Sequence, residues 1–232
     1  MDTDTNKSHT GEDMGLPQMK IDWVSPQDYL EGENDGEAKH EYVDGEIYAM
    51  SGASLVHNDV CLNFYDALRR HARGRGCRVN LLDVKVHIEA ANTWFYPDVV
   101  VSCEEPEEGD PYALTHPRLI AEVLSPSTEA NDRGRKFDLY RLLPSLSEYV
   151  LVSQACQSVH VYTRGEAGTW TFRGFGAHDE IHLRSLDLTV GVDALYEGTD
   201  VPEKITLRVL PPERHPEPSP EGGDPMPQAG DR

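Results

Sequence analysis

The feature that most constrains this chain is a carboxylate in the middle of an apolar segment. Residues 119–124 read Leu-Ile-Ala-Glu-Val-Leu, so a strand here is apolar on both faces except at Glu122. Such a strand is typical of the centre of a sheet that is covered on both sides. Strand alternation puts Ile120 and Leu124 on the face of Glu122. An ionised carboxylate in these surroundings is costly unless it is paired, hydrogen-bonded or bound to a metal.

A second carboxylate, Asp98, opens another apolar run, Tyr-Pro-Asp-Val-Val-Val-Ser. Taken alone, Asp98 is compatible with capping a turn after Pro97, and Glu122 with a buried ion pair to a lysine or arginine. Adjacent strands lie about 4.8 Å apart, so two carboxylates on neighbouring strands can reach one cation. Oxygen-rich sites of this kind suit Mg²⁺ or Mn²⁺.

A lysine follows on the next element. The sequence predicts a helix from about residue 131 to residue 143, ended by Pro144. Its i, i+4 spacing places Asp132, Lys136 and Tyr140 on one face. Lys136 is therefore a candidate third member of the site, and the alternative is an ordinary surface pair with Asp132, which contributes little to stability.

The rest of the chain alternates between helix and strand patterns. Further helices are expected from the Ser25-Pro26 cap and over residues 55–72, ended by Gly74 and Gly76. The expected strands are a hairpin over residues 40–50 with Asp44-Gly45 as its turn, then residues 79–89, 148–153, 158–165 and 169–174, with residues 181–190 closing the sheet. This pattern predicts an α/β (α+β) fold, a mixed β-sheet core flanked by helices with an N-terminal β-hairpin.

The two ends differ from this middle part. Residues 1–20 and 211–232 are polar, and the second range is rich in Pro, Gly and charge, so we expect disordered tails around one domain over residues 21–210. No apolar run approaches the roughly 18 residues of a membrane span. The first residues also lack the pattern of a signal peptide. We therefore expect a cytoplasmic location and no membrane association.

The four cysteines, Cys61, Cys77, Cys103 and Cys156, are scattered along the chain. They form no CxxC pair and no zinc-ligand spacing. Reduced structural thiols are expected for such cysteines in the cytoplasm.

The charge balance limits how the chain can contact nucleic acid. It has 21 Lys and Arg against 41 Asp and Glu, a formal net charge of −20. A protein that coats DNA without specificity has the opposite sign, because phosphate affinity comes from Lys and Arg. Any such contact must depend on local basic clusters. Two clusters occur: Arg69, Arg70, Arg73, Arg75 and Arg78, then Arg133, Arg135, Lys136 and Arg141.

Several of these segments together resemble the Uma-two family, within the PD-(D/E)XK nuclease superfamily. The matching stretches are HEYVDGEIYAMSGAS with His57 just after it, YPDVVVS, PRLIAEVLSPSTEANDRGRKFDLYR and, more weakly, PSLSEYVLVS. They span roughly residues 22–197, and EVLSPST…DRGRK…Y is their most specific part. The resemblance implies a restriction-endonuclease-like core with Asp98 and Glu122 as metal ligands.

The resemblance also implies roles for further residues. In the wider superfamily a lysine stands two residues after the glutamate, where this chain has Leu124. The Uma-type pattern instead offers Lys136 from the helix. Glu41 and His57 fall at recurring positions, where Glu41 would help to hold the metal and His57 would contact substrate. Without the family, Glu41 is interpreted as a solvated cross-strand partner and His57 as a structural histidine.

The implied reaction is metal-dependent hydrolysis of phosphodiester bonds in DNA, with Mg²⁺ or Mn²⁺ as cofactor. Asp98, Glu122 and the backbone carbonyl of Val123 would hold the cation, which activates a water and neutralises charge on the phosphate. Lys136 would orient that water or stabilise the developing charge.

Two other functions stay open. A nuclease-fold binding or regulatory module without activity is favoured by the acidity, because DNA is repelled except at the arginine clusters. A metal-dependent hydrolase of a small phosphoester would need no basic groove. Motifs for ATP hydrolysis, dinucleotide binding and serine hydrolysis are missing from the sequence. A homodimer is compatible with the resemblance, since related proteins commonly pair, although no segment indicates an interface.

Overall fold

The structure is a computed structural model, and it describes residues 23–36, 38–50, 52–104 and 111–204. The expected tails, residues 1–20 and 211–232, lie outside the described residues. The helices are α1 (Pro26–Asp35), α2 (Leu55–Ala72), η1 (Glu89–Ala91), α3 (Glu129–Asn131), η2 (Asp132–Lys136), α4 (Phe137–Tyr140), η3 (Glu166–Gly168) and α5 (Val192–Leu195). No described helix is long and apolar enough to span a membrane.

The described strands form three sheets. The strands are β1 (His40–Val43), β2 (Glu46–Ala49), β3 (Arg78–Leu81), β4 (Lys85–Ile88), β5 (Thr93–Phe95), β6 (Val99–Ser102), β7 (Ala113–Leu114), β8 (Leu119–Leu124), β9 (Glu148–Ser153), β10 (Ser158–Arg164), β11 (Trp170–Gly176), β12 (Glu180–Leu183) and β13 (Leu188–Gly191). The central sheet has the order β11-β10-β9-β8-β6-β3, a second has the order β2-β1-β5-β4-β7, and β12 pairs with β13. β8 and β9 run parallel and β6 and β8 antiparallel, so the central sheet is mixed, as expected.

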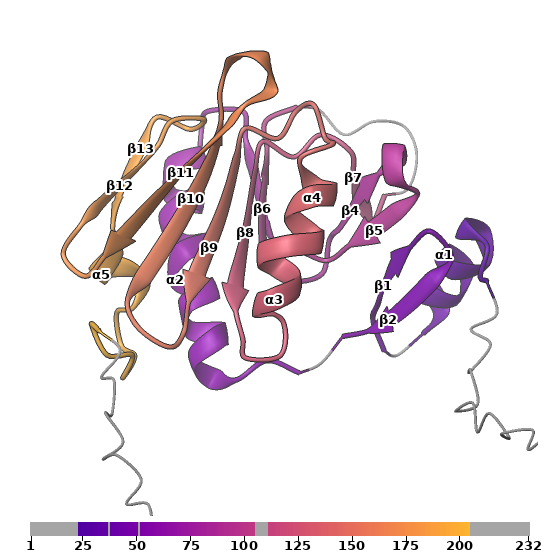
Figure 1. The fold of residues 1–232 in the computed structure, drawn as a ribbon, viewed down its shortest axis with the longest axis horizontal. Helices are drawn as coiled ribbons and strands as arrows, with labels where there is room; N and C mark the ends of the chain where they lie inside the picture. The colour runs from indigo at the N-terminus through magenta and orange to yellow at the C-terminus, as the bar shows by residue number, and fades with distance from the viewer. Residues whose placement is uncertain (1–22, 37, 51, 105–110, 205–232) are drawn as a thin grey trace, which may run out of the picture.

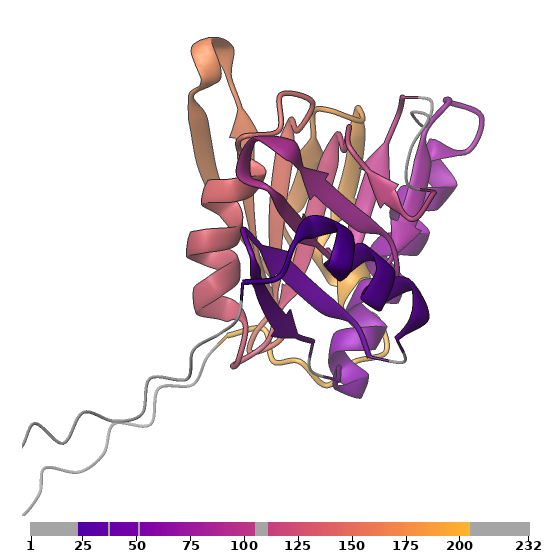
Figure 2. The same ribbon diagram turned by 90° about the vertical axis from the view of Figure 1, so that its right-hand side faces the viewer.

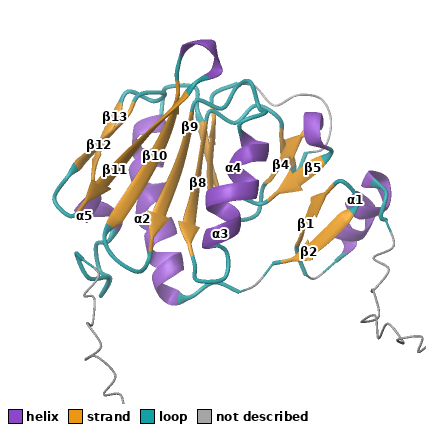
Figure 3. Ribbon diagram, viewed as in Figure 1, coloured by secondary structure: helices purple, strands orange, loops and turns teal. Residues whose placement is uncertain are grey.

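The six-stranded sheet is covered on both faces (Figure 1 and Figure 3). On one face α2 packs Phe64 and Leu68 against alternate residues of the central strands, such as Val99 and Val101. On the other face lie α4 and the five-stranded sheet, and Tyr140 is part of their common core with Ile120. Figure 2 shows the five-stranded sheet from its outer side, with α1 upon it. This double cover explains why all six residues of β8 are buried.

Local sequence signals predict the helix and hairpin ends. Ser25 caps α1 by accepting a hydrogen bond from the backbone N–H of Asp28, and Pro26 is in the first turn. Asp44 and Gly45 have φ angles of 45° and 99°, which is the backbone that a two-residue hairpin turn requires. The predicted bounds of the second helix, residues 55–72, are those of α2.

Three expected elements are wrong in detail. Residues 79–89 do not form one strand, because Leu82 has a φ of 55° and the chain leaves β3 for β4, in another sheet. Residues 181–190 do not close the central sheet, since they belong to the separate β12–β13 hairpin. The helix expected from residue 131 begins at Glu129 and contains the π-helical stretch η2.

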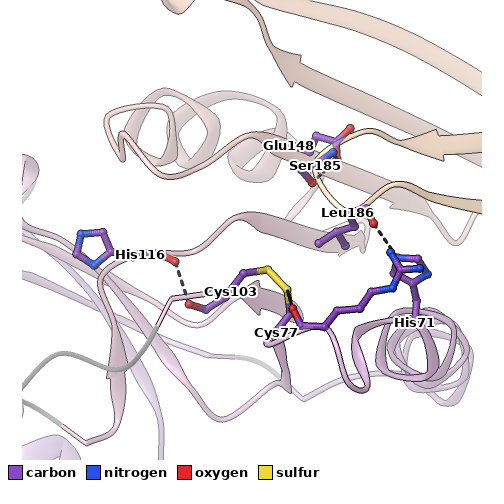
Figure 4. The surroundings of a disulfide bond; sticks show 9 residues. His71, Cys77, Cys103, His116, Glu148, Ser185 and Leu186 are labelled. Carbon is purple, nitrogen blue, oxygen red and sulfur yellow. Dashed lines mark hydrogen bonds between the residues drawn. A yellow bond between two sulfur atoms is a disulfide. The ribbon is translucent and has the colours of Figure 1, made fainter.

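The expectation of four reduced thiols is also wrong, because Cys77 and Cys103 form a disulfide (Figure 4). Arg78 pairs with Ser102 in the antiparallel β3–β6 ladder, so the cysteines beyond them face each other. This proximity depends on sheet register, which cysteine spacing does not reveal. Cys61 and Cys156 are free.

Candidate active site

Asp98 and Glu122 lie side by side, on neighbouring strands as expected. Val99 pairs with Ala121 in the antiparallel β6–β8 ladder, and one step further along the ladder Asp98 meets Glu122. The backbone N–H of Asp98 donates to Oε2 of Glu122 at 3.2 Å. The N–H of Val123 donates to Oδ2 of Asp98 at 2.6 Å. Backbone groups of rigid strands therefore position both carboxylates.

Lys136 enters the same cluster from η2. Its Nζ lies 2.7 Å from Oε1 of Glu41, 3.2 Å from Oε1 of Glu122 and 3.6 Å from Oδ1 of Asp132. Lys136 and Asp132 are both buried, so they are not an ordinary surface pair. Tyr140 donates its hydroxyl to Oε1 of Glu122 at 3.2 Å, from the same helical segment. A π-helical stretch is frequent at functional sites, and here it carries two of the cluster's charged residues.

Glu41 and His57 complete the cluster from two other elements. Glu41 of β1 accepts a hydrogen bond from the N–H of Tyr96 and is only 9% exposed, so it is not a solvated cross-strand partner. His57 of α2 has its Nε2 3.1 Å from Oδ1 of Asp98. The structure thus brings together all five side chains that the sequence indicated, from four separate elements and the start of β6.

The cluster holds more negative than positive charge. Three buried carboxylates, those of Glu41, Glu122 and Asp132, surround Lys136, and the half-buried Asp98 lies beside Glu122. Burial raises the pKa of Glu122 well above its ordinary value; Lys136 opposes this shift, and the other three carboxylates add to it. Burial likewise raises the pKa of Asp132. Burial alone would lower the pKa of Lys136, but the charges of Glu122 and Glu41 outweigh it and the pKa is raised.

The hydrogen bond between His57 and Asp98 favours the protonated form of the imidazole. Burial alone would lower its pKa, but the hydrogen bond to Asp98 and the charge of Asp98 raise it above the ordinary histidine value. The imidazole and the Asp98 carboxylate therefore form a hydrogen-bonded pair at the N-terminal end of α2.

The cluster fits a divalent cation. Oδ1 of Asp132 is buried, and no hydrogen-bond partner for it occurs among the described residues. Carboxylate oxygens are the ligands that Mg²⁺ and Mn²⁺ prefer, and a cation here would offset the excess negative charge. Val123 reaches the site through its N–H, which binds Asp98. Its carbonyl as a metal ligand stays a prediction.

A cavity of about 680 Å³ opens above the cluster. Its wall includes Glu41, His57, Asp98, Glu122, Asp132 and Lys136, together with Tyr48, Arg135 and Gln154. Arg135 donates to the Tyr48 hydroxyl at 2.7 Å, and its guanidinium lies 5.2 Å from the ring centre. Sequence reasoning missed Tyr48 and Gln154, although Tyr48 belongs to one of the matching stretches.

The two arginine clusters have different positions. Of the second cluster, Lys136 is in the site and Arg135 is in the cavity wall, whereas Arg133 and Arg141 pair with Glu129 and Asp138. The first cluster begins at the other end of α2, about 18 Å along the helix from His57, and none of its five arginines lines the cavity. Arg135 is thus the cluster residue, besides Lys136, placed to contact a ligand in the cavity.

Comparisons with known proteins identify the family of this chain. The family described as "Uma2: Putative restriction endonuclease" matches residues 26–194. An uncharacterized protein of Synechocystis sp. is 37% identical over 182 residues, which are 78% of this chain and 96% of the relative. A second uncharacterized Synechocystis protein is 37% identical over 149 residues, 63% of this chain and 84% of that protein.

A solved structure shows the same fold. It is the crystal structure of "a putative nuclease belonging to DUF820" from Anabaena variabilis, with a TM-score of 0.61 and 18% identity. The match covers 75% of this chain and 97% of that chain. Residues 26–194 include all five predicted site residues, and the chain belongs to the Uma2 family of restriction-endonuclease-like proteins.

Proposed function

We propose that this protein is a metal-dependent nuclease that hydrolyses phosphodiester bonds in DNA. The observation that supports this most is the buried group of three carboxylates around Lys136, with Asp98 beside Glu122, at the wall of an open cavity. Such a cluster is costly to bury for structure alone, because its charges are only partly paired. Family membership and fold point to the same reaction class.

Each residue has a task that follows from its contacts. Asp98 and Glu122 would hold a divalent cation, which would supply an activated water and neutralise charge on the phosphate. Glu41 holds the Lys136 ammonium at 2.7 Å, and the ammonium in turn orients the water or stabilises the developing negative charge. His57, hydrogen-bonded to Asp98 and lining the cavity, contacts substrate.

The cavity wall supports a nucleic-acid substrate in a chain of high net negative charge. Arg135 is exposed enough to pair with a phosphate, and guanidinium groups bind phosphates in fixed geometry. Tyr48 beside it is 40% exposed and offers a ring on which a base can stack. Two such residues at the cavity mouth allow local binding of DNA without a basic surface.

One observation favours a second candidate, a nuclease-fold module that binds without cleaving. All four oxygens of Asp98 and Glu122 already accept hydrogen bonds or ion pairs from the protein. Such a network is able to hold the fold without a metal. On this alternative the carboxylates bind Mg²⁺ and Mn²⁺ weakly.

The test is cation binding and plasmid cleavage in matched variants. Mn²⁺ and Mg²⁺ binding is measured by calorimetry, and nicking of supercoiled DNA is followed with each metal. Asp98→Asn and Glu122→Gln remove one charge each, and Glu148→Gln is the control, because Glu148 is fully buried but absent from the cavity wall.

We expect cation binding and nicking in the wild type and in Glu148→Gln, and loss of both in the two site variants. Binding that survives both site substitutions would contradict the metal site and favour the binding module. A wild type that binds metal and leaves DNA intact, but cleaves a small phosphodiester such as bis(p-nitrophenyl) phosphate, would favour the small-phosphoester hydrolase.

A further inference from the structure

A second group of ligand atoms lies on the α2 side of Asp98. His57 and Cys61 are one turn apart on α2, at i and i+4, and both face Asp98. One ligand atom from each of the three residues lies within 4.8 Å of the other two. Cys61 is fully buried, and it is the free cysteine of this cluster, whereas Cys156 is half-buried elsewhere.

We propose that His57, Cys61 and Asp98 form a binding site for Zn²⁺ that shares Asp98 with the oxygen-rich site. An imidazole nitrogen, a thiolate and a carboxylate are the three ligand types that zinc takes in proteins. Atoms bound to one tetrahedral zinc stand roughly 3.3–3.6 Å apart, because the ion lies about 2.0–2.3 Å from each. The 3.1 Å between Nε2 of His57 and Oδ1 of Asp98 is close to that spacing. The ligand atoms of all three residues lie within 4.8 Å of one another, so side-chain rotation is needed to bring them onto one ion.

The chemistry of the two sites selects different cations. Glu122, Glu41 and Asp132 offer oxygen to Mg²⁺ or Mn²⁺, whereas a thiolate and an imidazole select softer ions such as Zn²⁺. Zinc binding displaces the thiol proton of Cys61 and the Nε2 proton that His57 shares with Asp98, so the ligands are the thiolate and an unprotonated imidazole nitrogen. His57 and Asp98 line the cavity, so an ion enters from there, and a water from the cavity fills the fourth position.

Zinc at this position opposes the proposed reaction. A zinc ion here would bind one oxygen of Asp98, which is then no longer free for the cation of the oxygen-rich site. It would also bind the His57 nitrogen that otherwise contacts substrate. Zn²⁺ therefore competes with Mn²⁺ or Mg²⁺ and inhibits cleavage. The inhibition rests on the proposed function, whereas the zinc site itself rests on the three residues alone.

The site is tested with Co²⁺, which replaces zinc and reports its ligands by absorption. A bound thiolate produces a charge-transfer band in the near ultraviolet. We expect this band for the full-length wild type and for Cys156→Ser, and its loss in Cys61→Val and in the smaller Cys61→Ala. Zinc affinity, measured by competition with Co²⁺, should fall at least about 100-fold in the Cys61 variants. Substituting a residue that only hydrogen-bonds to a metal ligand already lowers metal affinity by about 10–100-fold.

Circular dichroism shows which Cys61 variant remains folded. The cobalt band and the zinc affinity of that variant are compared with those of the wild type. A missing band in the wild type, or a band that persists without the Cys61 thiol, would overturn the zinc site.

Measurements of DNA nicking in the presence of zinc test the competition between the two sites. Zinc inhibition of Mn²⁺-dependent nicking should be relieved by added Mn²⁺ in the wild type. It should require at least tenfold more zinc in the Cys61 variants, each measured against its own rate without zinc. Equal inhibition of all variants would overturn the competition. A cobalt band without any DNA cleavage would support the zinc site and contradict the proposed nuclease activity. DNA cleavage without a cobalt band would support the nuclease activity and contradict the zinc site.

Discussion

The backbone N–H of Asp98 donates a hydrogen bond to Oε2 of Glu122, and the N–H of Val123, next to Glu122, donates to Oδ2 of Asp98. The two carboxylates are therefore held by each other's strands, at the point where β6 begins beside β8. This reciprocal arrangement orients both acids without flexible loops. Sites built on strands keep their geometry better than sites on loops, and such positioning is what a metal-dependent reaction requires.

Stability should fall as pH rises, because of Glu122. Burial raises its pKa, so the folded protein keeps a proton that the unfolded chain loses, and the free energy of unfolding decreases from the ordinary carboxyl range upward. The raised pKa of His57 acts in the same direction, since its proton is also bound more tightly in the folded state. Urea denaturation with a chelator present, from about pH 5 to about pH 8, should show this decline. In Glu122→Gln the free energy of unfolding should decrease less with pH. An unchanged decrease would contradict the attribution of this pH dependence to Glu122.

Lys136→Met should destabilise the fold strongly. The substitution leaves the carboxylates of Glu41 and Glu122 buried without their cation, which costs about 3–5 kcal/mol. Lys39→Met is the control, because Lys39 pairs with Asp83 at the exposed surface, where a pair contributes at most about 1 kcal/mol. Chemical denaturation at neutral pH measures both. Similar losses in the two variants would show that the cluster is already neutralised by protonation.

Arg135→Gln should raise the KM for DNA while leaving Mn²⁺ affinity unchanged, on the proposed function. Arg135 lines the cavity beside Tyr48, and its ion pair is with Glu46, which lies outside the carboxylate cluster. A charged hydrogen bond to phosphate is worth about 1.5–3 kcal/mol, so a rise of tenfold or more in KM is expected. Arg133→Gln is the matched control, since Arg133 pairs with Glu129 outside the cavity wall. An equal rise in both variants would point to general charge effects.

Gly45→Ala should lower the stability of the fold by more than the positive φ of this residue alone explains. A Cβ at Gly45 would collide with the Trp23 ring, and the residue has a φ of 99°. Gly74 has a φ of 79° with open space around its Cβ position, so Gly74→Ala isolates the backbone effect, about 1 kcal/mol. We expect Gly45→Ala to lose at least twice as much in thermal denaturation. Equal losses would mean that Trp23 moves aside without cost.

Removing the Cys77–Cys103 disulfide should lower stability by about 3–4 kcal/mol, because the bond closes a loop of intermediate length; the two cysteines are 26 residues apart. The double variant Cys77→Ser, Cys103→Ser tests this by urea denaturation, with Cys156→Ser as the control for a free thiol. A reducing agent should have the same effect on the wild type as the double variant. Unchanged stability would indicate that the β3–β6 ladder holds this region unaided.

Local signals explain which parts of the fold are readable from sequence. Ser25-Pro26, Asp44-Gly45 and the apolar spacing of residues 55–72 act within a few residues, and each marks its element where the structure has it. The strand predicted over residues 79–89 fails because its alternation continues across Leu82, where the chain changes sheet. Alternation reports that a residue faces a core, but not which core.

The same distinction applies to the site. The sequence by itself determined that Glu122 lies in a doubly buried strand, that Asp98 opens another, and that Lys136 follows on a helix, because burial patterns and periodicity are local properties of the chain. Only the tertiary structure decided that Asp132 joins them as a buried carboxylate, that Cys77 meets Cys103, and that Cys61 faces Asp98. These contacts depend on strand register, on a π-helical turn and on the packing of α2, which arise from interactions between segments far apart in the chain.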